Sequence, residues 1–376
     1  MRITRVIPLA MLGLLVMLGG LPAIALADVA RSAKMVDADE GSDAAMKYAL
    51  GQKYFKGDEV PQDLTAAVLW WTRAALLGHV GAQRNLGVSY HRGEGVAQNL
   101  SEAVKWYTRA AEQGDAKSQF NLGMMYERGD GVEQNQREAV KWYALAAELG
   151  DVDAQRSLGV CYVLGDGVEK SYKEAVVWWS RAAAQGNSDA QFDLAVMYDR
   201  GEGVVQNYRE AVKYYAMAAE QGDPMAQVNL GMRYVVGQGV APDYKEAAKW
   251  YLRAAQQGDA KAQFNLAGLL YNGQGTEQNY AAAYTWASLA AAQGEQNAAQ
   301  NRDGAASHLS PVELVAAQEL ATKMQAWIEL PLPKGEAPLP PVVAAVAVKV
   351  KDKPPVKPAA KEPVKKVTVK AKKRKK

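Results

Sequence analysis

The sequence of 376 residues is poor in the side chains that hold metals and form cross-links. It contains one cysteine, Cys161, and three histidines, His79, His91 and His308. A single cysteine cannot form an intramolecular disulfide, so packing alone must hold the fold together. The histidines show no H-E-x-x-H spacing and, with one cysteine, fit no recognisable zinc pattern. We therefore expect no metal and no cofactor.

The sequence also lacks the usual signatures of a serine nucleophile. Neither G-x-S-x-G nor S-x-x-K occurs in it. Carboxylates are plentiful, but five of them recur in one column at steps of 36 residues: Glu102, Glu138, Glu174, Glu210 and Glu246. This periodicity is typical of first-turn helix residues that the helix dipole favours, not of an acid and base pair. The residues therefore predict a protein that is not an enzyme.

Charge is unevenly divided along the chain. Residues 28–330 carry 28 Lys and Arg against 38 Asp and Glu, a net charge of −10. Residues 331–376 carry 14 against 3, a net charge of +11, and are rich in Pro, Lys, Ala and Val. This tail has too few aromatic and leucine residues to build a core, so we expect it to be disordered.

The N-terminal residues 1–27 have the layout of a secretory signal peptide. Arg2 and Arg5 precede a long apolar run that ends in Ala25-Leu26-Ala27. Asp28, not a cysteine, stands directly after this point, which argues against a lipoprotein anchor there. We expect a periplasmic or secreted protein, with residues 28–41 as a linker. The alternative is an inner-membrane anchor formed by the uncleaved apolar segment.

Glycine pairs recur along the chain at steps of 36 residues. The pair Gly129 and Gly131 in RGDGV reappears as RGEGV, LGDGV, RGEGV, VGQGV and NGQGT, while the residue between the glycines changes among Glu, Asp and Gln. A metal or phosphate site would need that residue to keep its chemistry, whereas a turn needs only glycines able to adopt positive φ. The pairs therefore predict turns in seven repeats that span residues 42–293.

Each repeat is predicted to contain two helices. In the third, Asp115 is placed to cap a first helix with Leu122 and Tyr126 on one face, and Gly129 ends it. Asn135 is placed to cap a second helix with a wide apolar band that includes Trp142.

The repeats predict an all-α solenoid, because one helical hairpin cannot bury its own apolar faces and must stack on the next. Columns of leucine and tryptophan would form its core, and a glycine column that includes Gly123 would let helices approach closely. Residues 294–330 are predicted to form C-terminal capping helices, with a long helix from Ser310-Pro311 to about Glu329. Residues 331–376 follow as the basic tail.

The repeat consensus, AQxxLGxxYxxGxGVxQNxxEAVKWYxxAAExGD, closely resembles the Sel1-like repeat family, a relative of the tetratricopeptide repeat. The resemblance implies a right-handed superhelical α-solenoid that serves as an adaptor for protein complexes, in bacteria often outside the cytoplasm. It does not identify a partner. A cysteine-rich branch of the family is linked to β-lactam binding and hydrolysis, but this sequence lacks the cysteines of that branch.

A partner protein or peptide is predicted to bind along the side of the first helices that lies opposite the Leu and Tyr core. The candidate residues there are Asn85, Arg92, Lys117, Asn121, Arg128, Asp193, Arg200, Asn229 and Asn265. Asparagine can bond a peptide backbone without reading its side chains. The alternative is that these asparagines bond neighbouring helices, and the sequence leaves both interpretations open.

We expect an exported, non-catalytic scaffold of the bacterial envelope with the basic tail as a second attachment point. The tail has three interpretations: adhesion to anionic envelope polymers or lipid headgroups, a solvated linker, or nucleic-acid binding, which export disfavours. Two other functions remain open. One is a β-lactamase-like envelope hydrolase, and the other is a polyanion-binding protein in which the repeats are only a spacer.

Overall fold

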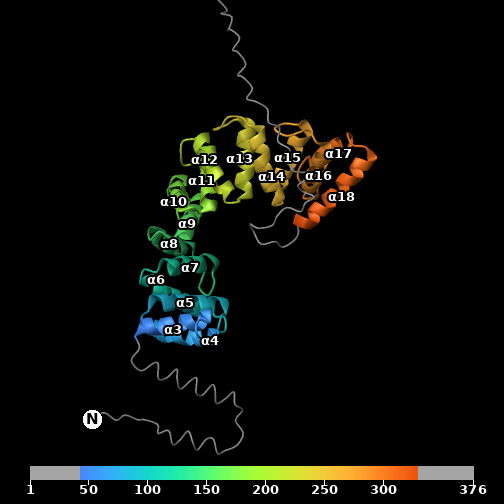
Figure 1. Ribbon diagram of the computed structural model, residues 1–376. Coiled ribbons are helices and arrows are strands. Elements are labelled where there is room, and N and C mark those ends of the chain that lie inside the picture. Colours follow the sequence, from blue (N-terminus) through green and yellow to red (C-terminus); the bar gives the residue numbers. More distant parts are fainter. Residues whose placement is uncertain (1–42, 329–376) are drawn as a thin grey trace, which may run out of the picture. The chain divides into compact units, whose positions relative to one another are not determined.

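The computed structural model describes residues 43–328, and this part of the chain contains helices and no strands (Figure 1). The predicted signal peptide, linker and basic tail lie outside the described residues. The helices are α3 (Ala44–Lys56), α4 (Leu64–Leu76), α5 (Val80–Arg92), α6 (Leu100–Glu112), α7 (Ala116–Arg128), α8 (Gln136–Glu148), α9 (Val152–Leu164), α10 (Tyr172–Ala184), α11 (Ser188–Arg200), α12 (Tyr208–Glu220), α13 (Pro224–Val236), α14 (Tyr244–Gln256), α15 (Ala260–Asn272), α16 (Tyr280–Ala292), α17 (Ala298–Ala306) and α18 (Pro311–Ile328). The tandem two-helix repeats confirm the predicted all-α solenoid.

The chain divides into two compact units. The first contains α3 to α10, and the second contains α12 to α18. Residues of α11 are divided between them after Ala190. Within each unit, every first helix packs on the second helix of its own repeat, and each second helix packs on the next first helix.

The helix boundaries follow from side-chain caps. Asp115 accepts a hydrogen bond from the Ser118 amide at 2.9 Å, and Asn135 accepts one from the Glu138 amide at 3.1 Å. Gly129 ends α7 in the left-handed conformation with φ of 78°, where its amide donates to the Met125 carbonyl. The same scheme recurs along the array, so short polar side chains and glycines set the 36-residue period.

The second glycine of each pair has a further role that the turn alone does not explain. Gly131 has φ of 71°, and a Cβ atom there would lie 2.3 Å from the Leu100 carbonyl carbon at the start of α6. Gly167 approaches Gln136 at the start of α8 in the same way, also at 2.3 Å. The turn of one repeat therefore presses on the backbone of the preceding repeat, and only glycine fits there.

The glycine column inside the first helices accommodates an aromatic ring. A Cβ atom on Gly123 would lie 2.6 Å from the ring of Tyr143, which comes from α8 of the same repeat. Leu122 is fully buried, and Tyr126 and Trp142 are partly buried at the edges of the same core cluster. Close contact between the two helices of a repeat thus depends on a glycine paired with a large ring.

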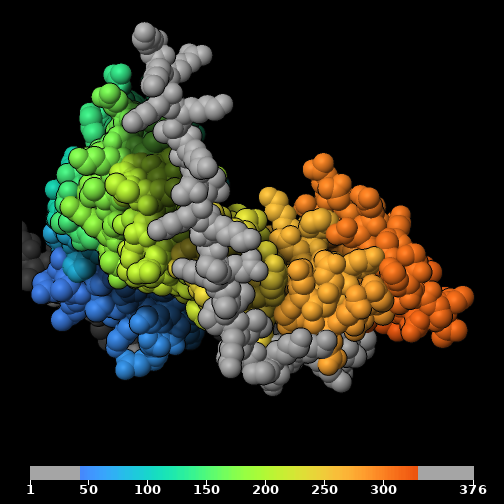
Figure 2. All heavy atoms as spheres, turned by 90° about the horizontal axis from the view of Figure 1, so that it is seen from above, coloured from blue at the N-terminus to red at the C-terminus, as the bar shows by residue number. Residues whose placement is uncertain are grey.

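The C-terminal helices cover the last repeat. α17 and α18 pack on α16, and Ala317 and Met324 of α18 are buried in its core cluster. Ser310 and Glu313 form the predicted capping box, in which each side chain meets the other residue's amide. In Figure 2 the orange and red side chains of α15 to α18 form one continuous packed surface.

The first repeat differs from the others at the second turn position. Glu59 stands where the later repeats have glycine, and it keeps a positive φ of 62°. Its side chain is 77% exposed and pairs with Lys53. Because α3 is the first described helix, residues 43–328 hold no preceding second helix for Glu59 to approach, which is the contact that demands glycine in later repeats.

Candidate functional site

The predicted partner-binding residues lie on the first helices of both units. In the first unit, Asn85 and Arg92 belong to α5, and Lys117, Asn121 and Arg128 belong to the adjacent α7. In the second unit, Asp193 and Arg200 belong to α11, Asn229 to α13 and Asn265 to α15. We call these nine residues the first-helix stripe. The arginines and Lys117 are exposed, and the remaining members are partly buried.

The asparagines of the stripe do not bond neighbouring helices. Asn229 donates to the Met225 carbonyl of its own helix at 2.9 Å. Across residues 43–328, the side-chain amides of Asn85, Asn121 and Asn265 have no hydrogen-bond partner. Three amides of the stripe therefore keep both their donor and their acceptor available to a ligand.

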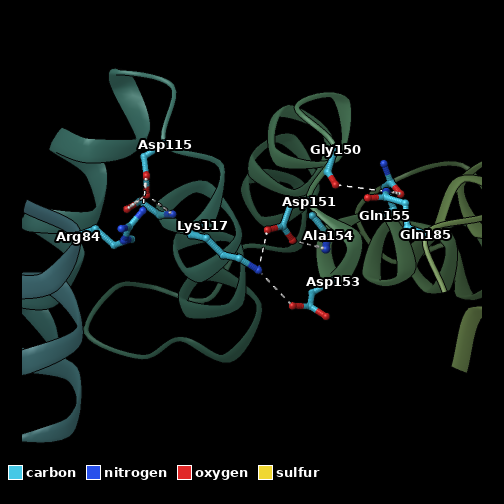
Figure 3. A network of polar contacts seen from close by, with 10 residues as sticks. Arg84, Asp115, Lys117, Gly150, Asp151, Asp153, Ala154, Gln155 and Gln185 are labelled. Atoms are coloured by element: carbon cyan, nitrogen blue, oxygen red, sulfur yellow. Dashed lines mark hydrogen bonds and ion pairs between the residues drawn. The ribbon is translucent and has the colours of Figure 1, made fainter. Parts of the chain in front are cut away.

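Lys117 instead connects two repeats of the first unit (Figure 3). Its Nζ lies 3.1 Å from the buried carboxylate of Asp151, which caps α9, and 3.5 Å from Asp153. The hydrogen bond to Asp151 raises the pKa of Lys117. Arg84 makes the equivalent contact with Asp115 at 2.8 Å. These cations satisfy cap carboxylates, so Lys117 has a structural contact besides its predicted role in binding.

In the sixth repeat, exposed apolar side chains flank the stripe residue Asn229. Met225, Met232 and Val236 of α13 are exposed on either side of Asn229. The sequence interpretation considered Asn229 alone and therefore missed these side chains, although their spacing of seven and four residues was visible. The face of the second unit is therefore a mixture of amide and aliphatic groups.

A ladder of glutamines connects the repeats, and the sequence analysis assigned it no role. In five of the first helices, a buried glutamine donates to a carbonyl near the end of the preceding repeat's second helix, at 3.0 to 3.2 Å. Another glutamine, which directly follows the second helix of the same repeat, donates to the side-chain oxygen of the buried glutamine at 2.6 to 3.0 Å. Figure 3 shows one such rung, in which Gln185 bonds Gln155 and the Gly150 carbonyl. The AQ dipeptide of the consensus was the available signal.

Arginines cover the tryptophans of the second helices. The guanidinium carbons of Arg109, Arg181 and Arg253 lie 4.4 to 4.5 Å from the ring centroids of Trp106, Trp178 and Trp250. Each of these rings is 8% exposed. Arg181 and Arg253 also reach Glu148 and Glu220 of the preceding repeat at 3.1 Å. The outer side of each such repeat is thus closed by a cation.

Burial, and not a cluster suited to a metal ion, marks the ionisable groups of the described chain that have strongly raised pKa values. No group of three or more His, Cys, Asp or Glu with metal-binding geometry occurs in residues 43–328. Burial raises the pKa of the Cys161 thiol to about 12, and burial with a hydrogen bond to Glu127 raises that of Tyr143 further. These groups stay protonated at neutral pH. Among the described helices, none has the length and apolarity needed to cross a membrane.

This chain belongs to the Sel1 repeat family. The family model matches it seven times in succession, at residues 42–79, 80–115, 116–151, 152–187, 188–223, 224–259 and 260–295. The matches begin where the predicted array begins and end within two residues of its predicted end. A comparison with curated proteins found no match.

Two solved structures show the same architecture. A protective antigen of uropathogenic Escherichia coli strains with a Sel1-like repeat fold is 34% identical, with a TM-score of 0.70, over 81% of this chain and 64% of that protein. A Sel1 repeat protein from Oxalobacter formigenes is 37% identical, with a TM-score of 0.55, over 66% of this chain and 97% of the other. The chain thus spans just under two thirds of the first relative.

Membership of the family carries a general expectation about activity. Sel1 repeats form a fold that is generally used for protein–protein interaction and is typically a non-catalytic scaffold. The unpaired amides and apolar side chains on the first helices agree with this use.

Proposed function

We propose that this protein is an exported adaptor of the bacterial cell envelope that binds a partner protein along the first-helix stripe. The observation that carries the proposal is the set of unpaired amides at Asn85, Asn121 and Asn265. An asparagine that only stabilised the array would bond another repeat, as the buried glutamines do. These three do not, and they recur at one position of the first helices.

The chemistry of the stripe favours a peptide or protein surface as the ligand. An asparagine amide both donates and accepts, so it pairs with the backbone of an extended segment. Arg128 and Arg200 form no ion pair with any described residue, and they add exposed cations to the ends of their helices. Met225, Met232 and Val236 add exposed apolar contact area in the second unit. Mixed amide, cationic and apolar groups suit a protein partner better than a small substrate.

Export and the second attachment point rest on the sequence. The apolar segment that ends at Ala25-Leu26-Ala27 supports passage out of the cytoplasm. The net charge of +11 in residues 331–376 supports an electrostatic contact with anionic polymers or lipid headgroups of the envelope.

Affinity capture from the native envelope tests both attachment points. The chain ending at residue 330 is compared with the chain ending at residue 376, at low and high salt. We expect one protein to co-purify with both and to survive salt. Material held only by the longer chain and lost in salt would make the tail, not the repeats, the functional part.

Substitutions in the stripe then test the binding face. We expect the triple variant Asn85→Ala, Asn121→Ala and Asn265→Ala to bind the captured partner at least about tenfold more weakly. Its melting temperature should stay close to that of the parent, because no internal hydrogen bond is lost. Asn301→Ala, on α17 outside the stripe, is the matched control, since its side-chain amide also has no hydrogen-bond partner in residues 43–328. Unchanged binding by the triple variant would refute the proposed face.

A further inference from the structure

The third repeat departs from the array at two positions, one near the end of α8 and one at its C-cap. Leu145, near the end of α8, stands in the column of the arginines that cover tryptophans, and Leu149 stands in the column of the second ladder glutamine. The two leucines are four residues apart, so they lie on one side of the helix end. Their side chains are 50% and 57% exposed. Two stabilising residues are therefore replaced together by exposed apolar ones.

The loss of the ladder glutamine leaves a buried acceptor without a partner. Gln119 is only 4% exposed, and its Nε2 donates to the Ala111 carbonyl at 3.0 Å. Its Oε1 is buried and has no hydrogen-bond partner, whereas the corresponding oxygen of Gln155 accepts from Gln185 at 2.9 Å. An unsatisfied buried acceptor costs folding free energy. Leucine at residue 149 is thus unfavourable for the fold itself.

The loss of the arginine exposes an aromatic ring and a carboxylate. Within the described chain no cation lies over Trp142, and its ring is more exposed than those of Trp106, Trp178 and Trp250. Glu112 ends α6 at the position from which Glu148 and Glu220 reach the arginine of the following repeat. In residues 43–328 the Glu112 carboxylate has no ion pair or hydrogen bond.

We infer that Glu112, Trp142, Leu145 and Leu149, here called the third-repeat surface, bind a partner protein segment that supplies an arginine between aliphatic side chains. The partner arginine takes the place that Arg181 and Arg253 occupy in other repeats, over the indole and against the carboxylate. The aliphatic neighbours cover the two leucines. This surface lies on second helices, so it goes beyond the partner site proposed on the first helices.

Charge and shape favour arginine as the recognised group. A guanidinium stacks flat on an aromatic ring and pairs with a carboxylate at its edge, whereas an ammonium does so less well. The array shows this geometry four residues before three of the ladder glutamines, with 4.4 Å between the Arg181 guanidinium carbon and the Trp178 ring centroid in one of them. The unpaired negative charge of Glu112 supplies the complementary partner. A purely apolar ligand would leave that carboxylate without a cation.

A repair variant tests the inference, because it should bind less while folding better. The full chain and its double variant Leu145→Arg, Leu149→Gln serve as bait and counter-bait for a displayed library of random peptides. We expect peptides recovered on the parent alone to share an arginine flanked by Leu, Ile or Val. A synthetic consensus peptide should bind the double variant at least about tenfold more weakly by fluorescence anisotropy. The variant's melting temperature should rise by about 2–4 °C.

Two controls identify the cause of the loss. Lysine in place of the consensus arginine should weaken binding to the parent, and Met217→Arg, which adds the same charge in the same column of another repeat, should leave it unchanged. The triple asparagine variant of the first-helix stripe should bind the peptide as the parent does, which separates this inference from the proposed function. Recovery of no such peptide, equal binding by the double variant, or a consensus that matches residues 331–376 of this chain would overturn it.

Discussion

The third and fourth repeats are built on the same backbone and end their second helices differently. In the fourth, Gln185 completes a glutamine rung and Arg181 covers Trp178. In the third, leucines stand at both positions, and Gln119 keeps an unsatisfied oxygen. The turn glycines, by contrast, are present in both, against the start of the preceding second helix. The third repeat therefore lacks a pair of hydrogen-bonded glutamines but keeps the glycines that set the backbone of its turn.

The largest effect should come from the turn glycines, and it should be equal in the two repeats. Gly131→Ala and Gly167→Ala each combine left-handed strain of about 1–2 kcal/mol with overpacking of about 1–3 kcal/mol against backbone. We expect each to lower the free energy of unfolding by about 2–5 kcal/mol, measured by urea denaturation. Gly150→Ala is the control. Its φ is also positive, but a Cβ atom there meets nothing within 4 Å, so strain alone applies. Equal costs at all three sites would contradict the close approach.

Substituting the buried glutamine should destabilise the fourth repeat more than the third. Gln155→Leu removes two hydrogen bonds, one to the Ala147 carbonyl and one from the Gln185 side chain, and we expect a loss of about 1–3 kcal/mol. Gln119→Leu removes one hydrogen bond, to the Ala111 carbonyl, and also removes the unsatisfied oxygen, so it should cost about 1 kcal/mol less. Thermal denaturation of both variants checks the difference. A greater loss at Gln119 would mean that its oxygen is satisfied after all.

Exchanging the residues that follow the second helices should make the stabilities of the third and fourth repeats more alike. Leu149→Gln gives Gln119 its missing donor and should stabilise the chain by about 1 kcal/mol. Gln185→Leu makes the fourth repeat like the third and should destabilise it by a similar amount. Both are read as shifts in the midpoint of chemical denaturation. If both substitutions lowered the midpoint, the ladder would not be the reason for the difference.

The smallest effect should come from Cys161, which the third repeat replaces with Met125. Cys161→Met should change stability by less than about 1.5 kcal/mol, since both side chains fill the same buried column. Burial raises the pKa of the thiol from 9.0 to about 12, so its contribution to stability is present below pH 9 and is lost as pH rises toward 12. Iodoacetamide should therefore label native protein slowly at neutral pH. Labelling as fast in native as in denatured protein would contradict the burial.

The repeat period predicted the fold because each repeat contains the capping residues that set the ends of its own helices. Asp115, Asn135 and Gly129 act only on neighbouring residues, so their roles are readable locally. The capping box of Ser310 and Glu313 was predictable for the same reason. The described helices confirm the predicted solenoid, and the family matches confirm the resemblance.

Contacts between repeats were not readable in this way. Gln119 and Leu149 are 30 residues apart, and neither has an unusual neighbour in the sequence. The meaning of Leu149 appears only when its counterpart Gln185 is seen to complete a rung. The second role of Gly131 was hidden likewise, because a positive φ already accounted for it. The nine residues of the first-helix stripe stay a prediction, since binding depends on a partner that the chain does not encode.

Glu59 determines which repeats of such an array can be duplicated. A repeat copied into the middle of the array must present glycine at the second turn position, because the helix in front of it leaves no room for a side chain. The third or the fourth repeat meets this condition, and the first does not. Lengthening by gene duplication is therefore open to the interior repeats, whereas a duplicate of the first would interrupt the stack wherever another repeat preceded it.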